Sequence, residues 1–203
     1  MRPASSSISA LSRASEVPFS ILQAEQRRRV DLGEVAASRE PLLLQTLLGS
    51  CVSVCLRDPV SGVGGMNHIL VPSSVSNSRN SAQCGVHAME LLINGIMKLG
   101  GDRRGFVAKA FGGGNVLPGF ITPTVGELNS DFVREFLLAE SIPLVAQRMG
   151  GLKAVRVSFH TYTGRAFVHT IDGSRLPAII REETSYYHTG VEERFHPVEP
   201  KLF

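Results

Sequence analysis

The chain has 203 residues, a formal net charge of +3, three cysteines and no tryptophan. This charge is too small to indicate a nucleic-acid-binding protein, and three irregularly spaced cysteines argue against a disulfide framework. No apolar run approaches the length of a transmembrane helix, and the N-terminus lacks the apolar centre of a secretory signal. We therefore expect a cytoplasmic protein with free thiols and no membrane insertion.

The two ends of the chain differ from its middle. Residues 1–27 are rich in Ser, Ala and Arg without a sustained hydrophobic period, which predicts disorder. The basic run at 27–29 is interpreted as a solvated face. Residues 184–203 are polar and contain Pro, so they are expected to form a loose tail or a docked strand. Residues 28–183 then form one domain, long enough to bury a core without disulfides.

The first regular patterns predict a β-hairpin. The apolar run 41–48 has strand character, and residues 51–58 alternate, with Val and Leu on one face and the cysteines on the other. Strong turn residues follow at 58–62. Residues 63–72 are expected to form the return strand, followed by a polar loop at 74–81.

Two segments have helical periodicity. The first, 85–99, is ended by the glycine pair at 100–101. The second begins at a capping box formed by Thr124 and Glu127 and runs to about Ser141. Apolar residues three or four apart give each helix a buried stripe. The expected members are Val86, Met89, Ile93, Ile96 and Met97 in the first helix, and Phe132, Val133, Phe136 and Leu137 in the second.

Further strand patterns occur at 106–111, 153–160 and 165–171, the last two forming a hairpin. The order of strands and helices predicts an α+β fold with a largely antiparallel sheet and two principal helices. Residues 111–115 read Phe-Gly-Gly-Gly-Asn. Because no Lys-Ser or Lys-Thr pair follows, we interpret this loop as a close backbone contact or the lining of a site, rather than a phosphate-binding loop.

The first hairpin brings a cysteine and a histidine together. If its loop is the four residues 58–61, Arg57 pairs with Gly62, and the same register places Cys51 directly opposite His68. A nearby imidazolium lowers the pKa of a thiol. The thiolate then acts as a nucleophile while the histidine transfers protons.

The surroundings of Cys51 leave two interpretations open. The Gly49-Ser50 corner can expose the thiol and aim backbone N–H groups at an oxyanion. Alternatively, cysteine packs as a small hydrophobic residue, and a lone histidine on a strand is usually structural. A zinc site or disulfide is disfavoured because Cys51 and Cys55, four residues apart in a strand, are separated by about 13 Å. Cys84, before the first helix, is expected to pack.

Several segments in this order resemble the chemoreceptor glutamine deamidase family, CheD. The resemblance covers residues 28–172 and rests on LLGSCVSVCLRDPVSGVGGMNHILVP, AMELLINGIMKLGG, AKAFGGGNVL, VGELNSDFVREFLLAESIPLVAQRMGG and TGRAFVHTI. It implies a layered α+β sandwich whose catalytic arrangement is similar to that of cytotoxic necrotizing factor toxins. It also implies hydrolysis of selected glutamines of methyl-accepting chemotaxis receptors to glutamate, a step in chemotactic adaptation.

The resemblance also implies site residues. The nucleophile is the cysteine of the G-S-C motif, here Cys51, and the histidine ends the G-G-x-x-H segment, here His68. A threonine shortly before G-S-C assists this histidine, and Thr46 is the candidate, with Gln45 in that position if the placement is one residue off. The implied reaction passes through a thioester on Cys51 and needs no metal or organic cofactor.

The expected partners are the receptors, as substrates, and the CheC phosphatase, which regulates members of the family. Two other functions stay open. One is a non-catalytic regulatory adaptor that binds receptors or CheC, and the other is a cysteine hydrolase acting on another protein's glutamine or on a small amide. The presence of both Cys51 and His68 favours an active enzyme.

Overall fold

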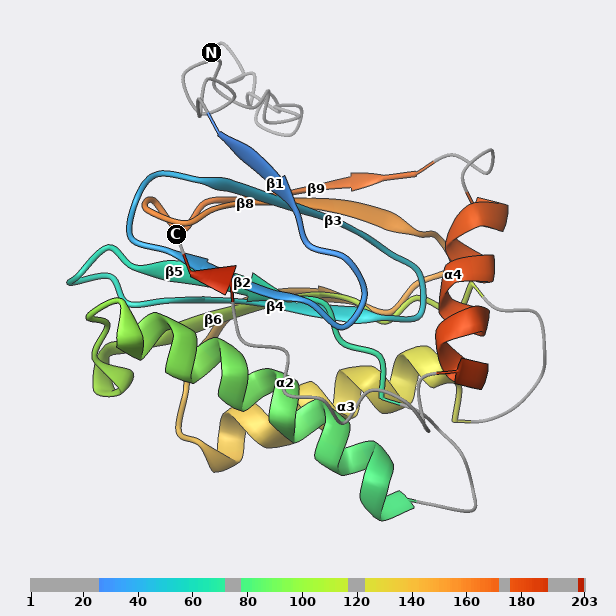
Figure 1. Cartoon of the computed structure of the whole chain (residues 1–203). Coiled ribbons are helices and arrows are strands. Elements are labelled where there is room, and N and C mark those ends of the chain that lie inside the picture. The colour runs from blue at the N-terminus through green and yellow to red at the C-terminus, as the bar shows by residue number, and fades with distance from the viewer. Residues whose placement is uncertain (1–25, 72–77, 117–122, 172–175, 190–200, 203) are drawn as a thin grey trace, which may run out of the picture.

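The structure is a computed structural model that describes residues 26–71, 78–116, 123–171, 176–189 and 201–202. These residues form two packed β-sheets, with two helices across the outer face of one sheet and a third helix at the end of the sandwich (Figure 1). Among the described residues, no helix has the length and apolarity needed to span a membrane.

The strands follow one another in each sheet in an order different from that of the sequence. The four-stranded sheet runs β1 (Arg27–Arg29), β3 (Leu43–Leu48), β8 (Val155–His160) and β9 (Ala166–Thr170). The six-stranded sheet runs β10 (Lys201–Leu202), β2 (Val35–Ser38), β5 (Gly64–Asn67), β4 (Val52–Arg57), β6 (Val107–Gly112) and β7 (Leu144–Met149). Antiparallel pairs predominate, which confirms the predicted fold class.

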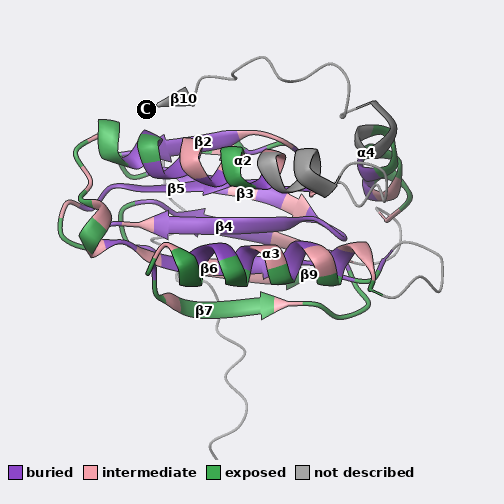
Figure 2. Cartoon of the chain, turned by 90° about the horizontal axis from the view of Figure 1, so that it is seen from below, coloured by how far each residue is buried: buried purple, intermediate pink, exposed green. Residues whose placement is uncertain are grey.

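The helices are α2 (Ser78–Lys98), α3 (Val125–Ala139) and α4 (Leu176–Thr189). A short 3-10 helix, η1, spans Arg103–Gly105. Helices α2 and α3 lie side by side over the six-stranded sheet, and α4 stands at one end of both sheets (Figures 1 and 2).

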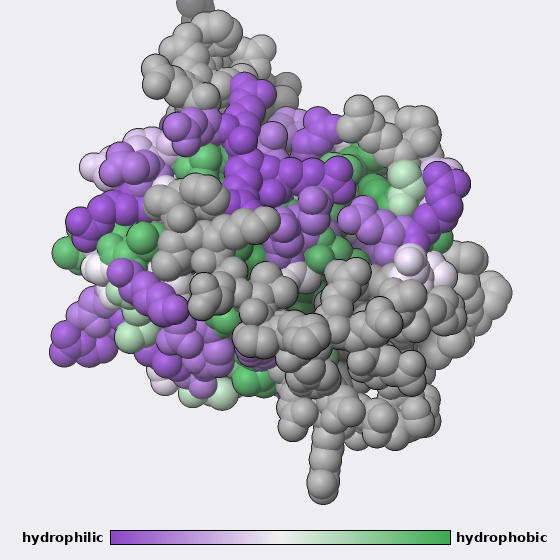
Figure 3. Space-filling view, viewed as in Figure 1, coloured by the Kyte–Doolittle hydropathy of each residue, from purple (hydrophilic) through white to green (hydrophobic). Residues whose placement is uncertain are grey.

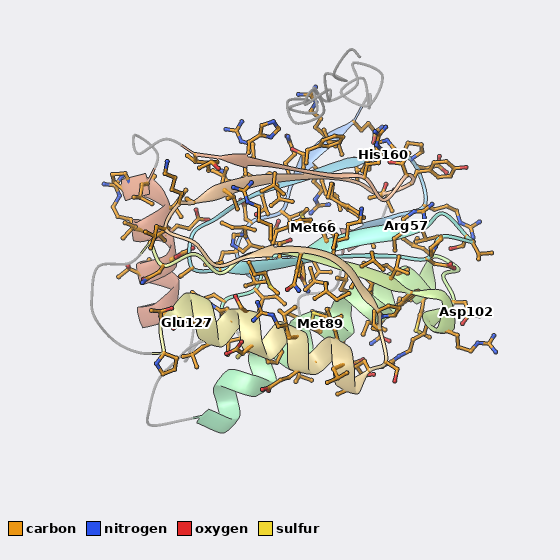
Figure 4. The ribbon with its side chains drawn as sticks, turned by 180° about the vertical axis from the view of Figure 1, so that it is seen from behind. Arg57, Met66, Met89, Asp102, Glu127 and His160 are labelled. Carbon is orange, nitrogen blue, oxygen red and sulfur yellow. The ribbon has the colours of Figure 1, made fainter. Side chains whose placement is uncertain are left out.

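Two apolar clusters hold these layers together. One lies between the sheets and includes Cys51 and Met66, and the other lies between the six-stranded sheet and the helices and includes Val54 and Met89. Figure 4 shows Met66 and Met89 on opposite sides of that sheet. Strand β4 contributes to both clusters because successive side chains of a strand point to opposite faces, and it is buried along almost its whole length (Figure 2). The predicted alternation of β4 is therefore confirmed.

Both predicted helices are present, but the first differs from its prediction. Helix α2 begins at Ser78 rather than at 85, so residues 78–81 are helical instead of part of a polar loop, and residues 74–77 lie outside the described residues. Val86 and Met97 were assigned to its buried stripe and are 41% and 43% exposed. At 3.6 residues per turn, both lie about 60–80° around the helix from the fully buried Met89, on one flank.

The helix boundaries agree better with the sequence. The Thr124 hydroxyl accepts the Glu127 N–H at 3.2 Å, and the Glu127 carboxylate accepts the Thr124 N–H at 2.7 Å, which confirms the capping box. At the end of α2, Gly100 has a positive φ, and the N–H of Gly101 donates to the carbonyl of Ile96 at 3.0 Å. The glycine pair therefore closes the helix as predicted.

Four of the described elements had no counterpart in the sequence analysis: β2, η1, β7 and α4. Strand β2 is short and buried throughout, so it lacks alternation, whereas β7 is a largely exposed edge strand. Helix α4 spans the predicted domain boundary at 183–184. The basic run at 27–29 forms edge strand β1, and hydrophilic residues gather along it in Figure 3, so its interpretation as a solvated face is confirmed.

Candidate active site

The β4–β5 hairpin has a different register from the predicted one. Arg57 pairs with Gly64 rather than with Gly62. Gly62 belongs to the loop because its φ of +75° is a conformation that favours glycine. The prediction that Cys51 lies directly opposite His68 is therefore wrong.

Cys51 and His68 nevertheless face the same side of the sheet. They immediately precede Val52 and Ile69, which exchange two backbone hydrogen bonds of 2.9 and 2.8 Å. In an antiparallel pair, this relation places Cys51 and His68 diagonally across the ladder on one face. That face is turned towards the four-stranded sheet, because the side chain of His68 reaches Thr46 on β3.

The return strand is also shorter than predicted, since β5 ends at Asn67 instead of continuing to 72, and Pro72 lies outside the described residues. The Asn67 side chain accepts the N–H of Val54 at 2.8 Å, and its carbonyl accepts the hydroxyl of Ser53 at 2.6 Å. Side-chain bonds thus replace ladder bonds here. His68 lies in this interruption, between the ladder and the isolated bridge at Ile69.

Thr46 and Val30 fix the protonation of His68. The Thr46 hydroxyl donates to the Val30 carbonyl at 2.8 Å, so it accepts the Nδ1–H of His68 at 2.9 Å. The Val30 carbonyl also lies 3.4 Å from that Nδ1. These partners place the proton on Nδ1 and leave Nε2 as an acceptor. Nε2 is buried without a hydrogen-bond partner among the described residues.

His68 is a neutral base in this arrangement. Burial lowers its pKa to about 4, although the nearby Glu183 carboxylate acts in the opposite direction. Gln45 points elsewhere, because its side-chain amide donates to the Ser158 hydroxyl at 2.9 Å. Of the two candidate positions, the structure brings Thr46 to His68, and Gln45 lies apart.

Cys51 ends the segment Gly49-Ser50-Cys51, here called the donor segment, which carries the chain from β3 in one sheet to β4 in the other. The carboxylate of Glu183 on α4 lies against it. That carboxylate accepts the N–H groups of Gly49 (3.1 Å), Ser50 (3.1 Å) and Cys51 (3.3 Å) and the Ser50 hydroxyl (2.6 Å). Cys51 is fully buried, and Glu183 is 2% exposed.

The thiol of Cys51 is uncharged in this state. Burial and, next, the negative charge of Glu183 raise its pKa well above the usual value. A hydrogen bond between the thiol and the Glu183 carboxylate acts in the same direction. The described state therefore pairs a neutral thiol with a neutral imidazole.

The donor segment is held from behind by its carbonyl groups. Their donors are the N–H of Gly114 to Gly49 (2.8 Å), the Asn129 amide to Ser50 (2.9 Å) and the N–H of Gly113 to Cys51 (2.7 Å). In a planar trans peptide the C=O and the following N–H point in opposite directions. Anchoring the carbonyls of Gly49 and Ser50 therefore directs the next two N–H groups to the opposite side, towards Glu183.

The glycine loop at 111–115 thus makes the close backbone contact that its sequence indicated. Two further residues of the site, Asn129 and Glu183, were missed. Asn129 is a buried polar residue on the inward stripe of α3, four positions before Val133, and that interruption was a usable signal. Glu183 follows buried Ile179 by one helical turn, but its helix was not predicted.

The described residues contain no group of three or more His, Cys, Asp or Glu side chains arranged to hold a metal ion. Cys51, Cys55 and Cys84 are all free thiols, and Cys84 is partly exposed at α2. The chemical groups at the donor segment are a thiol, an imidazole, hydroxyl groups, backbone N–H donors and the Glu183 carboxylate that these donors bind.

Comparison with known proteins identifies similar chains. The family model described as CheD chemotactic sensory transduction matches residues 70–170. The probable chemoreceptor glutamine deamidase CheD of Thiobacillus denitrificans is 43% identical over 158 residues, 76% of this chain and 78% of the relative. Corresponding proteins from Laribacter hongkongensis (42% over 158 residues) and Chromobacterium violaceum (45% over 157 residues) each align with 76% of this chain and 77% of the relative.

Proposed function

The chain belongs to the CheD family, and we propose that it hydrolyses glutamine side chains of methyl-accepting chemotaxis receptors to glutamate in the cytoplasm, during chemotactic adaptation. One observation carries the chemical part of this proposal. The N–H of Ser50 bonds to Oε2 of Glu183, whereas the N–H groups of Gly49 and Cys51 converge on the position of its Oε1 atom. Such a position suits the carbonyl oxygen of an amide under attack by the Cys51 thiol.

In the first half of the reaction, Cys51 is the nucleophile and His68 is the base. The Nε2 of His68 takes the thiol proton, and the sulfur attacks the side-chain amide carbon of the glutamine. The N–H groups of Gly49 and Cys51, which share one carboxylate oxygen of Glu183, stabilise the oxyanion. His68 then donates its proton to the departing ammonia, and a thioester remains on Cys51.

In the second half, water hydrolyses the thioester. His68 removes a proton from the water, the new carbon–oxygen bond replaces the carbon–sulfur bond, and the thiol recovers its proton. Thr46 acts as a positioning residue because it accepts the Nδ1–H of His68 and keeps Nε2 available as the base. The net reaction consumes one water and releases ammonia and a glutamate side chain.

The glycine of the donor segment supports this use of the site. A Cβ atom at Gly49 would lie 2.8 Å from the Glu183 Oε1 atom and 2.8 Å from the Val116 Cγ2 atom. Any side chain there would intrude on the space next to the N–H donors, so glycine keeps that space open for a bound carbonyl or carboxylate group.

Mass spectrometry of a purified receptor cytoplasmic fragment tests the proposal. The fragment is incubated with the wild-type protein, with Cys51→Ala and with His68→Ala, and its peptides are analysed for conversion of glutamine to glutamate. We expect conversion at defined glutamines with the wild type and none with either variant. The variant Cys55→Ala, whose side chain lies in the same apolar cluster as Cys51, serves as the matched control and is expected to retain activity.

The alternatives give different results in this experiment. A folded wild-type protein that binds the fragment without converting it would overturn the deamidase proposal and favour the regulatory adaptor. Equal conversion of unrelated glutamine-bearing proteins in a competition assay would favour a hydrolase of other amides. Binding of CheC phosphatase, proposed here as a second partner, is measured separately by titration calorimetry with the purified phosphatase.

A further inference from the structure

The group bound to the N–H donors of the donor segment is the carboxylate of a glutamate of the same chain, Glu183. Glu183 has the same side chain as the product of glutamine hydrolysis, and its carboxylate contacts all three backbone N–H groups of the segment and the Ser50 hydroxyl. Its 2% exposure shows that the site is closed around it.

We propose that Glu183 is an intramolecular product mimic, which occupies the site of the substrate glutamine side chain and keeps the enzyme closed until α4 moves away. This inference rests on the proposed deamidase function. The geometry supports it, because a receptor glutamine cannot reach the fully buried Cys51 while the Glu183 carboxylate lies on the same N–H donors.

The attachment of α4 is suited to release. Its described side chains are mostly exposed. Its apolar contact consists of buried Ile179 and partly buried Leu176, which pack with Val116 and Ala154 in a small cluster separate from the two main ones. Glu182 adds a 3.6 Å ion pair with Arg29, and both side chains are about half exposed. A partly exposed pair of this kind adds little to docking. Glu183 itself contributes four hydrogen bonds to the donor segment, all through its carboxylate.

The closed state is also chemically at rest. The Glu183 carboxylate favours the neutral thiol, because a nearby negative charge opposes formation of a thiolate. Departure of α4 removes this charge, exposes Cys51 and frees the N–H donors in one movement. Access, thiol ionisation and oxyanion binding are thus all controlled by the same side chain.

The variant Glu183→Gln provides a direct test, since it places a carboxamide where the substrate carboxamide is proposed to bind. Cys51 would form a bond to the amide carbon of the introduced glutamine, the carbon–nitrogen bond would break with release of ammonia, and water would then hydrolyse the thioester. We expect position 183 to recover a carboxylate, detected as the amide-to-acid mass change in the tryptic peptide 182–194.

Two control variants define that result. Glu182→Gln places a carboxamide in the same peptide on a partly exposed side chain, and it is expected to stay an amide. Cys51→Ala combined with Glu183→Gln is also expected to keep its amide. Conversion at 183 that persists without Cys51, or equal conversion at 182, would overturn the proposed placement of Glu183 in the catalytic site.

Alkylation of Cys51 by iodoacetamide tests closure without using any deamidase activity. Site-resolved mass spectrometry measures the rate at Cys51, with the partly exposed Cys84 as an internal reference. In Glu183→Ala we expect Cys51 to react about tenfold faster or more, because removal of the carboxylate increases both access and thiolate formation. The rate at Cys84 is expected to stay unchanged. Equal Cys51 rates in the wild type and Glu183→Ala would overturn the inference.

Receptor deamidation by Glu183→Ala separates this inference from the proposed function. Faster conversion than by the wild type supports the product mimic, whereas slower conversion would identify Glu183 as an aid to catalysis and overturn it. If neither protein converts the receptor but Cys51 alkylation accelerates, closure by Glu183 stands and the proposed function fails. If the wild type converts the receptor and Glu183→Ala changes neither rate, the function stands and the product mimic fails.

Discussion

The two sides of the donor segment are built from different kinds of contact. On the rear side, its carbonyls bond to the glycine loop after β6 and to Asn129 of α3, both of which belong to the packed layers. On the front side, its N–H groups bond to one carboxylate from α4, a helix in which Ile179 is the one buried apolar residue among the described side chains.

This difference separates the geometry of the site from its occupancy. The rear contacts orient the N–H donors whether or not Glu183 is bound, so the arrangement for an oxyanion is preorganised. On the front side, a substrate side chain can replace the Glu183 carboxylate without breaking any hydrogen bond within a sheet. Changes on the rear side should therefore impair catalysis and folding together, whereas changes on the front side should alter access to Cys51.

The largest expected effect comes from the thiol itself. Cys51→Ala removes the proposed nucleophile, and we expect receptor deamidation to fall by about 10⁴-fold or more. Cys55→Ala, four residues further along on the same face, is expected to keep activity within about twofold. It should lose about 1 kcal/mol of unfolding free energy by creating a small cavity. Initial rates and urea unfolding curves measure both, and an active Cys51→Ala would assign the chemistry to another group.

On the rear side, Asn129→Asp probes the orientation of the N–H groups. The aspartate can still accept the N–H of Val71, as Asn129 does at 2.6 Å, but it cannot donate to the Ser50 carbonyl. We expect kcat to fall by about 100-fold because the Cys51 N–H is no longer aimed at the oxyanion. Asn94→Asp, on the exposed face of α2, is the control for charge. An unchanged kcat would show that the rear bond to Ser50 does not position the site.

The sequence analysis identified the rear side better than the front side. Short sequence patterns that each specify one local structure were confirmed. These are the alternation of β4, the capping box at Thr124 and the close backbone contact of the glycine loop. The hairpin register was displaced because sequence spacing alone did not show that Gly62 belongs to the loop.

The front side escaped prediction for a different reason. Glu183 lies more than 130 positions from the residues that bind it, so no local pattern links them. The sequence analysis assigned residues 184–189 of α4 to the polar tail and residues 176–183 to the domain, without predicting a helix there. Long-range polar contacts depend on the assembled fold, and a sequence shows them only when the helix that carries them is already placed.

The neutral state of His68 predicts a pH dependence of stability. Its pKa is about 4 in the folded chain and about 6.5 in an unfolded one, so the unfolded state binds more protons between these values. The stabilisation is complete above pH 6.5 and is lost progressively as the pH falls towards 4. Between pH 7.5 and 5 we expect a loss of about 2 kcal/mol of unfolding free energy from this group.

Urea unfolding at both pH values measures that loss, with His68→Asn as the reference. The variant lacks the buried imidazole, so the decrease of its unfolding free energy between the two pH values reports the other titrating groups. The wild-type decrease minus the variant decrease is the contribution of His68. Equal decreases in the wild type and His68→Asn would show that His68 is not held neutral by burial.

Thr46→Val compares the two positions that sequence reasoning left open. Valine cannot accept the Nδ1–H of His68, which leaves only the more distant Val30 carbonyl at 3.4 Å, so we expect kcat to fall about tenfold while binding of the receptor fragment is retained. Gln45→Ala removes only the bond to Ser158 and is expected to change kcat by less than about twofold. The reverse ranking would assign the supporting role to Gln45.

The smallest effect is expected at the apolar anchor of the front side. Ile179→Ala weakens the contact of α4 with Val116 and Ala154, and a loss of about 1 kcal/mol in docking would raise the rate of Cys51 alkylation about fivefold. Leu138→Ala, at an 81% exposed position of α3, is the matched control and should leave that rate unchanged. If α4 opens separately from the sheets, as proposed, the urea midpoint of Ile179→Ala should differ little from that of the wild type. If the unfolding free energy instead fell by the same amount as the opening free energy calculated from the alkylation rates, α4 would unfold together with the core. The distinction between fixed rear contacts and an exchangeable front contact would then fail.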